Sequence, residues 1–174
     1  MDIAQNSISA GASLIEIEVA EDIGEDVLKI RVTDNGCGMT PEQVQHVIDP
    51  FYTTRTTRSV GLGVPLFKME AEMTGGSFEI SSEKGKGTSL CALFKLSSVD
   101  MIPLGDIGGT VQLLITCNPK LDFLFTRSYR GAGEDRREFT LDTRELRQVL
   151  GEDVPLDAPD VVLWIRDYLA EQTE

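Results

Sequence analysis

The chain has 174 residues, of which 41% are apolar and 26% charged, a balance typical of one soluble globular domain with or without a small appendage. Its formal net charge of −13 argues against a nucleic-acid surface, because binding to a phosphate backbone requires a basic patch. No apolar run approaches the roughly 18 residues of a membrane span, so we expect no membrane association.

The first half of the chain alternates helices with strands. Helical spacing predicts helices over residues 2–10, 41–47 and 64–73. Apolar–polar alternation predicts strands over residues 14–19, 27–33, 77–82 and 88–96. This order predicts an α/β (α+β) two-layer sandwich, in which a mixed sheet carries helices on one face.

Beyond residue 97 the pattern changes. Residues 98–109, with Pro103 and several glycines, are interpreted as a connector. Residues 110–174 are interpreted as a small C-terminal α/β extension, a hairpin plus two helices. We expect the hairpin over residues 111–117 and 121–129, a third strand over 137–141, and helices over 142–151 and from 157 onward. The apolar stripe of the last helix is interpreted first as core packing, and second as a docking face for a partner or a second copy.

The three cysteines, Cys37, Cys91 and Cys117, are widely spaced, and the chain has a single histidine, His46. This composition argues against a zinc site and favours reduced thiols in a cytoplasmic protein. The start of the sequence has no basic region ahead of an apolar stretch, as a secretory signal would have. Cys37 is interpreted as a small buried filler rather than as a redox group.

The run Asp34-Asn35-Gly36-Cys37-Gly38 is the most informative motif. It places a carboxylate at the end of a predicted strand, and its glycines let the backbone pass close to a flat ligand. Such turns are common in proteins without a ligand, so the meaning of this one depends on three further segments. These are residues 2–13, where Asp2 and Asn6 share a helix face, residues 49–65 with the runs DPFYTTR and GLG, and residues 83–90 with the run GKGTSL.

Together these segments resemble the nucleotide-binding motifs of the GHKL ATPase superfamily, which includes DNA gyrase, the large heat-shock chaperone, sensor histidine kinases and the mismatch-repair protein MutL. Residues 2–13 and the DNGCG turn are most similar to MutL, whereas the other runs are most similar to histidine kinases. The resemblance covers residues 1–97. It implies a histidine-kinase-like ATP-binding domain with a Bergerat-type mixed sheet, and ATP with Mg²⁺ as cofactors.

The resemblance also implies roles for single residues around the base and the metal. Asp34 would accept a hydrogen bond from the adenine amino group, and Thr88 would complete the adenine pocket. Gly36 and Gly38 would let the chain pass the base. Asn6 would hold Mg²⁺ through its side-chain oxygen, a ligand type that this ion prefers.

Around the phosphates, the resemblance implies a mobile lid over the nucleotide. This lid would begin with Phe51, Thr53, Thr54 and Arg55. At the start of the next helix, backbone amides of Gly61, Leu62 and Gly63 would face the phosphates, where the helix dipole favours negative charge. Asp2 is a candidate general base. It is one methylene shorter than the glutamate of the hydrolysing members, and it lies on the first turn of its helix.

Three functions remain open, because phosphoryl transfer is mostly positioning and charge neutralisation. The first is a stand-alone, kinase-like module that transfers the γ-phosphate of ATP to a separate protein partner. The second is a nucleotide-responsive switch, in which ATP orders the lid and changes partner affinity without turnover. The third is an ATPase clamp resembling MutL or gyrase, which would require a homodimer and a competent base at Asp2. We rank them in this order.

Overall fold

A computed structural model describes residues 1–51, 62–151 and 153–173 of the chain. The helices are α1 (Asp2–Ser9), α2 (Pro41–Val47), α3 (Gly63–Met73), α4 (Ile107–Cys117), α5 (Thr143–Leu150) and α6 (Pro159–Thr173). The strands are β1 (Leu14–Asp22), β2 (Val27–Asp34), β3 (Ser77–Glu83), β4 (Gly87–Lys95), β5 (Asp122–Arg130) and β6 (Arg136–Asp142). Within these residues, no helix is both long and apolar enough to cross a lipid bilayer.

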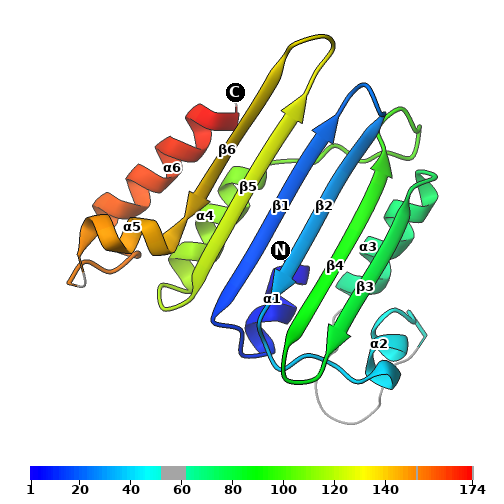
Figure 1. Cartoon of the computed structure of the whole chain (residues 1–174), viewed down its shortest axis with the longest axis horizontal. Helices are drawn as coiled ribbons and strands as arrows, with labels where there is room; N and C mark the ends of the chain where they lie inside the picture. The colour runs from blue at the N-terminus through cyan, green and yellow to red at the C-terminus, as the bar shows by residue number, and fades with distance from the viewer. Residues whose placement is uncertain (52–61, 152, 174) are drawn as a thin grey trace.

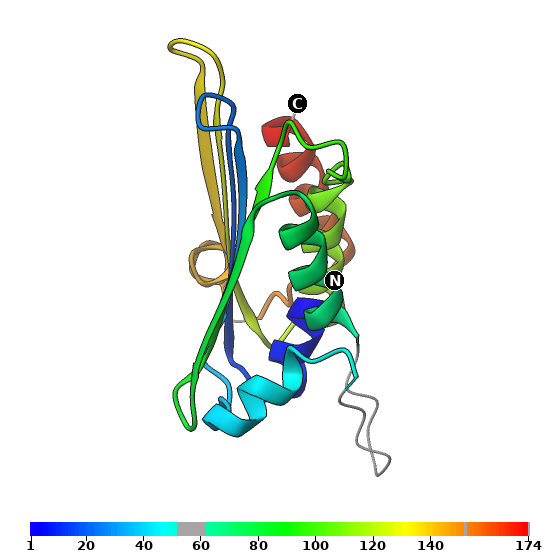
Figure 2. The ribbon, with the colours of Figure 1, turned by 90° about the vertical axis from the view of Figure 1, so that its right-hand side faces the viewer.

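The six described strands form one mixed sheet in the order β3-β4-β2-β1-β5-β6 (Figure 1). β1 pairs antiparallel with β2 and parallel with β5, and the other neighbouring strands are antiparallel. α1, α3, α4 and α6 cover one face of the sheet, whereas the short α5 lies on the other (Figure 2). The fold is an α+β sandwich consistent with the Bergerat fold, which confirms the predicted fold class.

Alternate apolar residues of the strands form the core between the sheet and its helices. In β1, Ile15 and Ile17 are buried, whereas Glu16 between them is exposed. Their register partners in β5, Phe123 and Phe125, are also buried. Residues from both halves of the chain therefore belong to one hydrophobic core.

The prediction of a strand over residues 111–117 was wrong, because these residues form most of α4. At this length, periodicity does not distinguish a buried strand from a buried helix. The Asp106 carboxylate accepts a hydrogen bond from the Gly109 N–H at 2.7 Å and caps the helix, which starts at Ile107, inside the predicted connector. The hairpin of this region instead joins β5 to β6.

Asp142 caps α5 at the end of β6. Its carboxylate accepts a hydrogen bond from the Arg144 N–H at 2.9 Å and another from the Arg144 guanidinium at 2.7 Å. The guanidinium hydrogen bond is the main reason why the pKa of Asp142 lies below its ordinary value of 3.8. When it is ionised, the Asp142 carboxylate therefore stabilises the folded state.

This lowered pKa predicts a pH-dependent effect of Asp142→Asn. The ionised carboxylate stabilises the fold above the unfolded-state pKa of 3.8, and the contribution is lost as the pH falls through the lower folded-state pKa. Asp142→Asn should therefore lower the melting temperature at pH 6 and have a much smaller effect near pH 2. Thermal unfolding followed by circular dichroism measures both values. Asp135→Asn, at an exposed ion pair 3.5 Å from Arg137, should change little at either pH. Equal losses for Asp142→Asn at the two pH values would contradict this assignment.

Candidate functional site

A cavity of about 120 Å³ lies between α1, the strand ends and the turn that follows β2. From α1 and the cap that follows it, the cavity is lined by Ile3, Asn6, Ser7 and Ala10, and from the strands by Val32, Asp34, Ile80, Thr88 and Leu90. The turn after β2 adds Cys37, Gly38 and Met39, and Val47 and Val64 close the remaining sides. The structure thus brings Asn6, Asp34, Gly38 and Thr88, four residues singled out from the sequence, around one largely apolar cavity.

Asp34 is the charged residue of this cavity and is only 9% exposed. The Ser7 hydroxyl donates a hydrogen bond to Oδ2 at 2.6 Å, and the Gly36 N–H donates one to Oδ1 at 2.9 Å. These two donors fix the orientation of the carboxylate. An ionised carboxylate has about four acceptor positions, so Asp34 can still accept hydrogen bonds from a group inside the cavity.

The turn after β2 is held on both sides by backbone contacts. The Cys37 N–H donates to the Ala10 carbonyl at 2.9 Å, and the Cys37 carbonyl accepts from the Gly85 N–H at 2.7 Å. Gly38 has a φ of 64°, and a Cβ atom there would lie 2.0 Å from the Glu83 carbonyl oxygen. Only glycine satisfies both the positive φ and this close approach. The turn is therefore fixed between the end of α1 and the β3–β4 hairpin.

Thr88 lies beside Asp34, because the two are register partners of β4 and β2. Its hydroxyl lies 2.9 Å from the hydroxyl of Ser82. Ser82 in turn accepts a hydrogen bond from the Met39 N–H at 2.8 Å and donates one to the Gly87 carbonyl at 3.0 Å. Ser82 thus links β3, β4 and the turn at the wall of the cavity.

Other predicted residues lie elsewhere. Phe51 is 91% exposed and does not line the cavity. Gly36 packs against α1, where a Cβ atom would lie 2.9 Å from the Cβ of Ala10. The lid and phosphate-turn residues Thr53, Thr54, Arg55 and Gly61 lie outside the described residues.

The structure brings Asp2 and Gly63 together at the amino end of α1. A Cβ atom on Gly63, the first residue of α3, would lie 2.7 Å from the Cβ of Asp2. Leu62, which precedes α3, is exposed. Asp2 is also exposed, and no described side chain caps the first turn of α1. Asp2 thus lies beside the predicted phosphate turn.

The sequence analysis missed Ser7, Ser82 and most of the apolar lining. The signal for Ser7 was available, because Ile3, Ser7 and Ala10 follow the i, i+4, i+7 spacing of one helix face. Cys37 was predicted to be buried but is exposed at the cavity, because the contacts of its backbone place the side chain outside the core. The structure describes Cys37, Cys91 and Cys117 as free thiols.

Comparison of the sequence with known proteins shows the family to which the chain belongs. Residues 1–98 of the 174 match the histidine kinase-, DNA gyrase B- and HSP90-like ATPase family. The chain is also 42% identical over 80 residues to the sensor protein SrrB of Staphylococcus aureus strains NCTC 8325 / PS 47, COL and MSSA476. The aligned segment covers 43% of this chain but spans only 13% of the length of these sensor proteins. The motifs that surround the cavity all lie within the matched region, and the chain belongs to the histidine kinase-, DNA gyrase B- and HSP90-like ATPase family.

Proposed function

We propose that the chain binds ATP in the cavity beneath α1, with the adenine ring between the sheet and the turn after β2. The observation that carries this proposal is the buried Asp34 carboxylate, whose two oxygens are oriented by Ser7 and Gly36 while it still borders the cavity. An oriented acceptor in an apolar cavity suits the amino group of a flat base. Thr88 adds a hydroxyl beside it, so the donors and acceptors present fit adenine.

The phosphates and Mg²⁺ are proposed to lie toward Asn6 and the start of α3. Asn6 offers one amide oxygen at the cavity, and Mg²⁺ completes its shell with phosphate oxygens and water. The eleven-residue α3 begins at Gly63 with no acidic residue in its first turn, so its free N–H groups can face an anion. When bound, Mg²⁺ supplies charge neutralisation. The roles of Phe51, Thr53, Thr54, Arg55, Gly61 and Leu62 in a lid and phosphate turn remain part of this proposal.

We propose a kinase-like activity, the transfer of the γ-phosphate to a separate protein partner. Hydrolysis requires a base held within hydrogen-bond reach of water. Asp2, the candidate base, is exposed, and its side chain is one methylene shorter than that of the glutamate in the hydrolysing members. We therefore rank transfer in trans, and a nucleotide switch without turnover, ahead of an ATPase clamp. We propose residues 1–97 as the ATP-binding unit and residues 110–174 as an extension that supports the sheet, with residues 98–109 as a connector that includes the first turn of α4.

Phosphate transfer and phosphate release separate these activities. The chain is incubated with ATP labelled at the γ-phosphate, with and without candidate partner proteins, and both labelled protein and free phosphate are measured. A kinase-like module should label a partner while the chain alone releases little phosphate. ATP binding without either reaction would identify the switch. Rapid release that Asp2→Asn abolishes would instead identify the clamp.

Asn6→Ala tests the proposed metal ligand separately. If Asn6 holds Mg²⁺, the variant should lose affinity for MgATP while its affinity for adenosine stays unchanged, because adenosine has no phosphates. Calorimetric titrations with the two ligands measure this. Equal losses for both ligands would show that Asn6 supports the fold rather than the metal.

Ser7→Ala should weaken MgATP binding about fivefold, because one net hydrogen bond contributes about 1 kcal/mol. The loss arises from a less well oriented Asp34, since the Ser7 hydroxyl is the donor to its Oδ2. Ser9→Ala makes the same chemical change at an exposed position of the same helix and should have no effect. Unchanged affinity in Ser7→Ala would show that Gly36 alone orients the carboxylate.

A further inference from the structure

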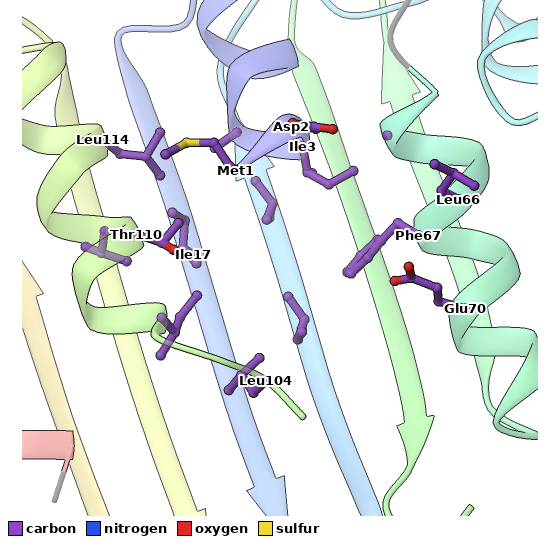
Figure 3. A pocket seen from close by; sticks show the side chains of 16 residues that line it. Met1, Asp2, Ile3, Ile17, Leu66, Phe67, Glu70, Leu104, Thr110 and Leu114 are labelled. Carbon is purple, nitrogen blue, oxygen red and sulfur yellow. The ribbon is translucent and has the colours of Figure 1, made fainter. Parts of the chain in front are cut away.

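Two cavities border α1, and they differ in how their polar side chains are bonded. The larger, of about 440 Å³, lies between α3 and α4 and shares Ile3 with the cavity proposed for ATP (Figure 3). Its walls are mainly apolar, and the Thr110 hydroxyl there donates a hydrogen bond to the Asp106 carbonyl at 2.9 Å. At the smaller cavity, several polar side chains bond to one another, and the direction of their hydrogen bonds follows from the groups involved.

The hydrogen bonds of Ser82 are directed by its single proton. Its hydroxyl oxygen lies 3.0 Å from the Gly87 carbonyl oxygen, 2.8 Å from the Met39 nitrogen and 2.9 Å from the Thr88 hydroxyl oxygen. A carbonyl oxygen only accepts, so Ser82 gives its proton to Gly87, and it accepts the Met39 N–H. Ser82 has no second proton for Thr88. Thr88 is therefore the donor of the hydrogen bond between the two hydroxyls.

The proton of Thr88 thus points into the protein and not into the cavity. The oxygen of its hydroxyl, which is an acceptor, is what Thr88 can offer to a ligand. Asp34, its register partner on β2, offers the remaining acceptor positions of its carboxylate. Ser7 gives its own proton to Asp34 at 2.6 Å. The side chains of Ser7, Asp34 and Thr88 form a wall that accepts hydrogen bonds and donates none, and we refer to it as the acceptor wall.

The acceptor wall favours a ligand that presents N–H groups to it. The 6-amino group of adenine carries two such protons. Hypoxanthine, the base of ITP, has a carbonyl oxygen at the same position, and this oxygen would face the lone pairs of Asp34 and Thr88 without a proton between them. A buried acceptor without a donor is costly, and a site built to bond one polar group rejects an analogue that lacks it. The direction of the Thr88 proton therefore bears on the choice between ATP and ITP.

We propose that Ser82 is a positioning residue that sets the selectivity for the base through Thr88. Ser82 does not line the cavity itself. It accepts the Thr88 proton and so keeps that proton away from the ligand. Without this acceptor, the Thr88 hydroxyl is free to turn and to donate to a carbonyl at position 6 of the base. This role rests on the proposed ATP binding and extends it from Asp34 to the hydroxyl groups around it.

Calorimetric titrations of the intact chain with MgATP and MgITP test this role. Ser82→Ala should lower the ratio of ATP affinity to ITP affinity about fivefold, the effect of one net hydrogen bond. The variant also removes the acceptor of the Met39 N–H, but a loosened turn would weaken both nucleotides alike and leave the ratio unchanged. Ser81→Ala is the matched control, because Ser81 is exposed on the same strand and pairs with Ser89. Its ratio should equal that of the wild-type chain.

Thr88→Val shows whether Ser82 acts through Thr88. Valine has nearly the same shape but no hydroxyl, so adding Ser82→Ala to this variant should leave the ratio unchanged. An equal change of the ratio with and without Thr88 would overturn the proposal.

Thr88→Val alone tests the direction of the proton, whether or not Ser82→Ala folds. If Thr88 only accepts, the variant should bind ATP more weakly and should bind ITP at least as tightly as the wild-type chain does. Weaker binding of ITP would show that Thr88 donates to the base, and it would overturn the proposal.

The wild-type chain separates failure of this role from failure of the ATP site. A chain that binds neither nucleotide would overturn the proposed ATP binding, and the role of Ser82 with it. A chain that binds ATP, but whose ratio stays the same in Ser82→Ala, would retain the ATP site and overturn the role of Ser82 alone.

Discussion

Asp34→Asn should weaken MgATP binding at least about tenfold. A hydrogen bond to a charged group contributes about 1.5–3 kcal/mol, and about 1.4 kcal/mol corresponds to tenfold in affinity. The structure adds a second cost. Ser7 and Gly36 both donate to the carboxylate, so the NH₂ group of asparagine would face a donor on one side. Asp34→Asn therefore loses charge, one acceptor position and orientation together.

Calorimetry with ATP and GTP measures this effect. GTP presents a carbonyl where adenine has its amino group, so the wild-type chain should bind GTP poorly. Asp153→Asn removes one negative charge at an exposed position and serves as the control for net charge. Equal affinities of the wild-type chain for ATP and GTP would contradict the assignment of Asp34 to the base.

A chain that ends at Ser98 should lose cooperative folding. The truncation removes the parallel partner of β1 over all nine residues of that strand. It also removes buried core residues, among them Val111, Leu114, Ile115, Phe123, Phe125, Ile165 and Leu169. Burial of one such side chain contributes about 1.5–3 kcal/mol, and a domain of this size is stable by only about 5–15 kcal/mol. Residues 1–98 keep their own ordering cost but lose the core contacts and the strand pairing that these residues give them, and a loss of a few such contacts is comparable with the total stability.

Thermal unfolding and amide proton spectra of the truncated chain measure this loss. Co-expression with residues 99–174 as a separate chain is the matched rescue, because it restores the non-covalent contacts without the connection. A sharp unfolding transition of residues 1–98 alone would show that the family-matched region is an independent folding unit, in which case the C-terminal region contributes less than its buried contacts indicate.

Secondary structure could be predicted well where local sequence determines it. The helix predicted over residues 41–47 forms as α2, and the alternation of β1 and β2 reproduces the buried and exposed residues. The pairing of β1 with β5 could not be predicted, because it joins residues that are 108 positions apart, such as Leu14 and Asp122, and follows no local pattern. β4 and β5 run in the same direction, so the chain between them must cross over the sheet, and a helix such as α4 is the usual form of such a crossover.

The candidate site could be predicted in part. The glycine spacing around Asp34 identified the turn, because positive φ angles and close backbone approach restrict those positions to glycine. The apolar lining from Ile80, Leu90 and Val64 could not be predicted as a site, since the same residues would equally serve a core. Only the position of α1 over the sheet shows that these side chains line a cavity and do not fill a packed core.

The two glycine motifs interlock, and this has a consequence for comparing relatives. A Cβ atom at Gly38 would lie 2.0 Å from the Glu83 carbonyl oxygen, and one at Gly87 would lie 1.9 Å from the Asp34 carbonyl oxygen. Each glycine is thus required by the backbone of the other motif, whether or not a ligand is present. Retention of both glycines in a relative would therefore indicate the same backbone arrangement, whereas retention of Asp34 and Ser7 would be the better indicator of ligand selectivity. A relative that keeps the glycines but replaces the carboxylate would have the shape of this pocket with a different preference for the base.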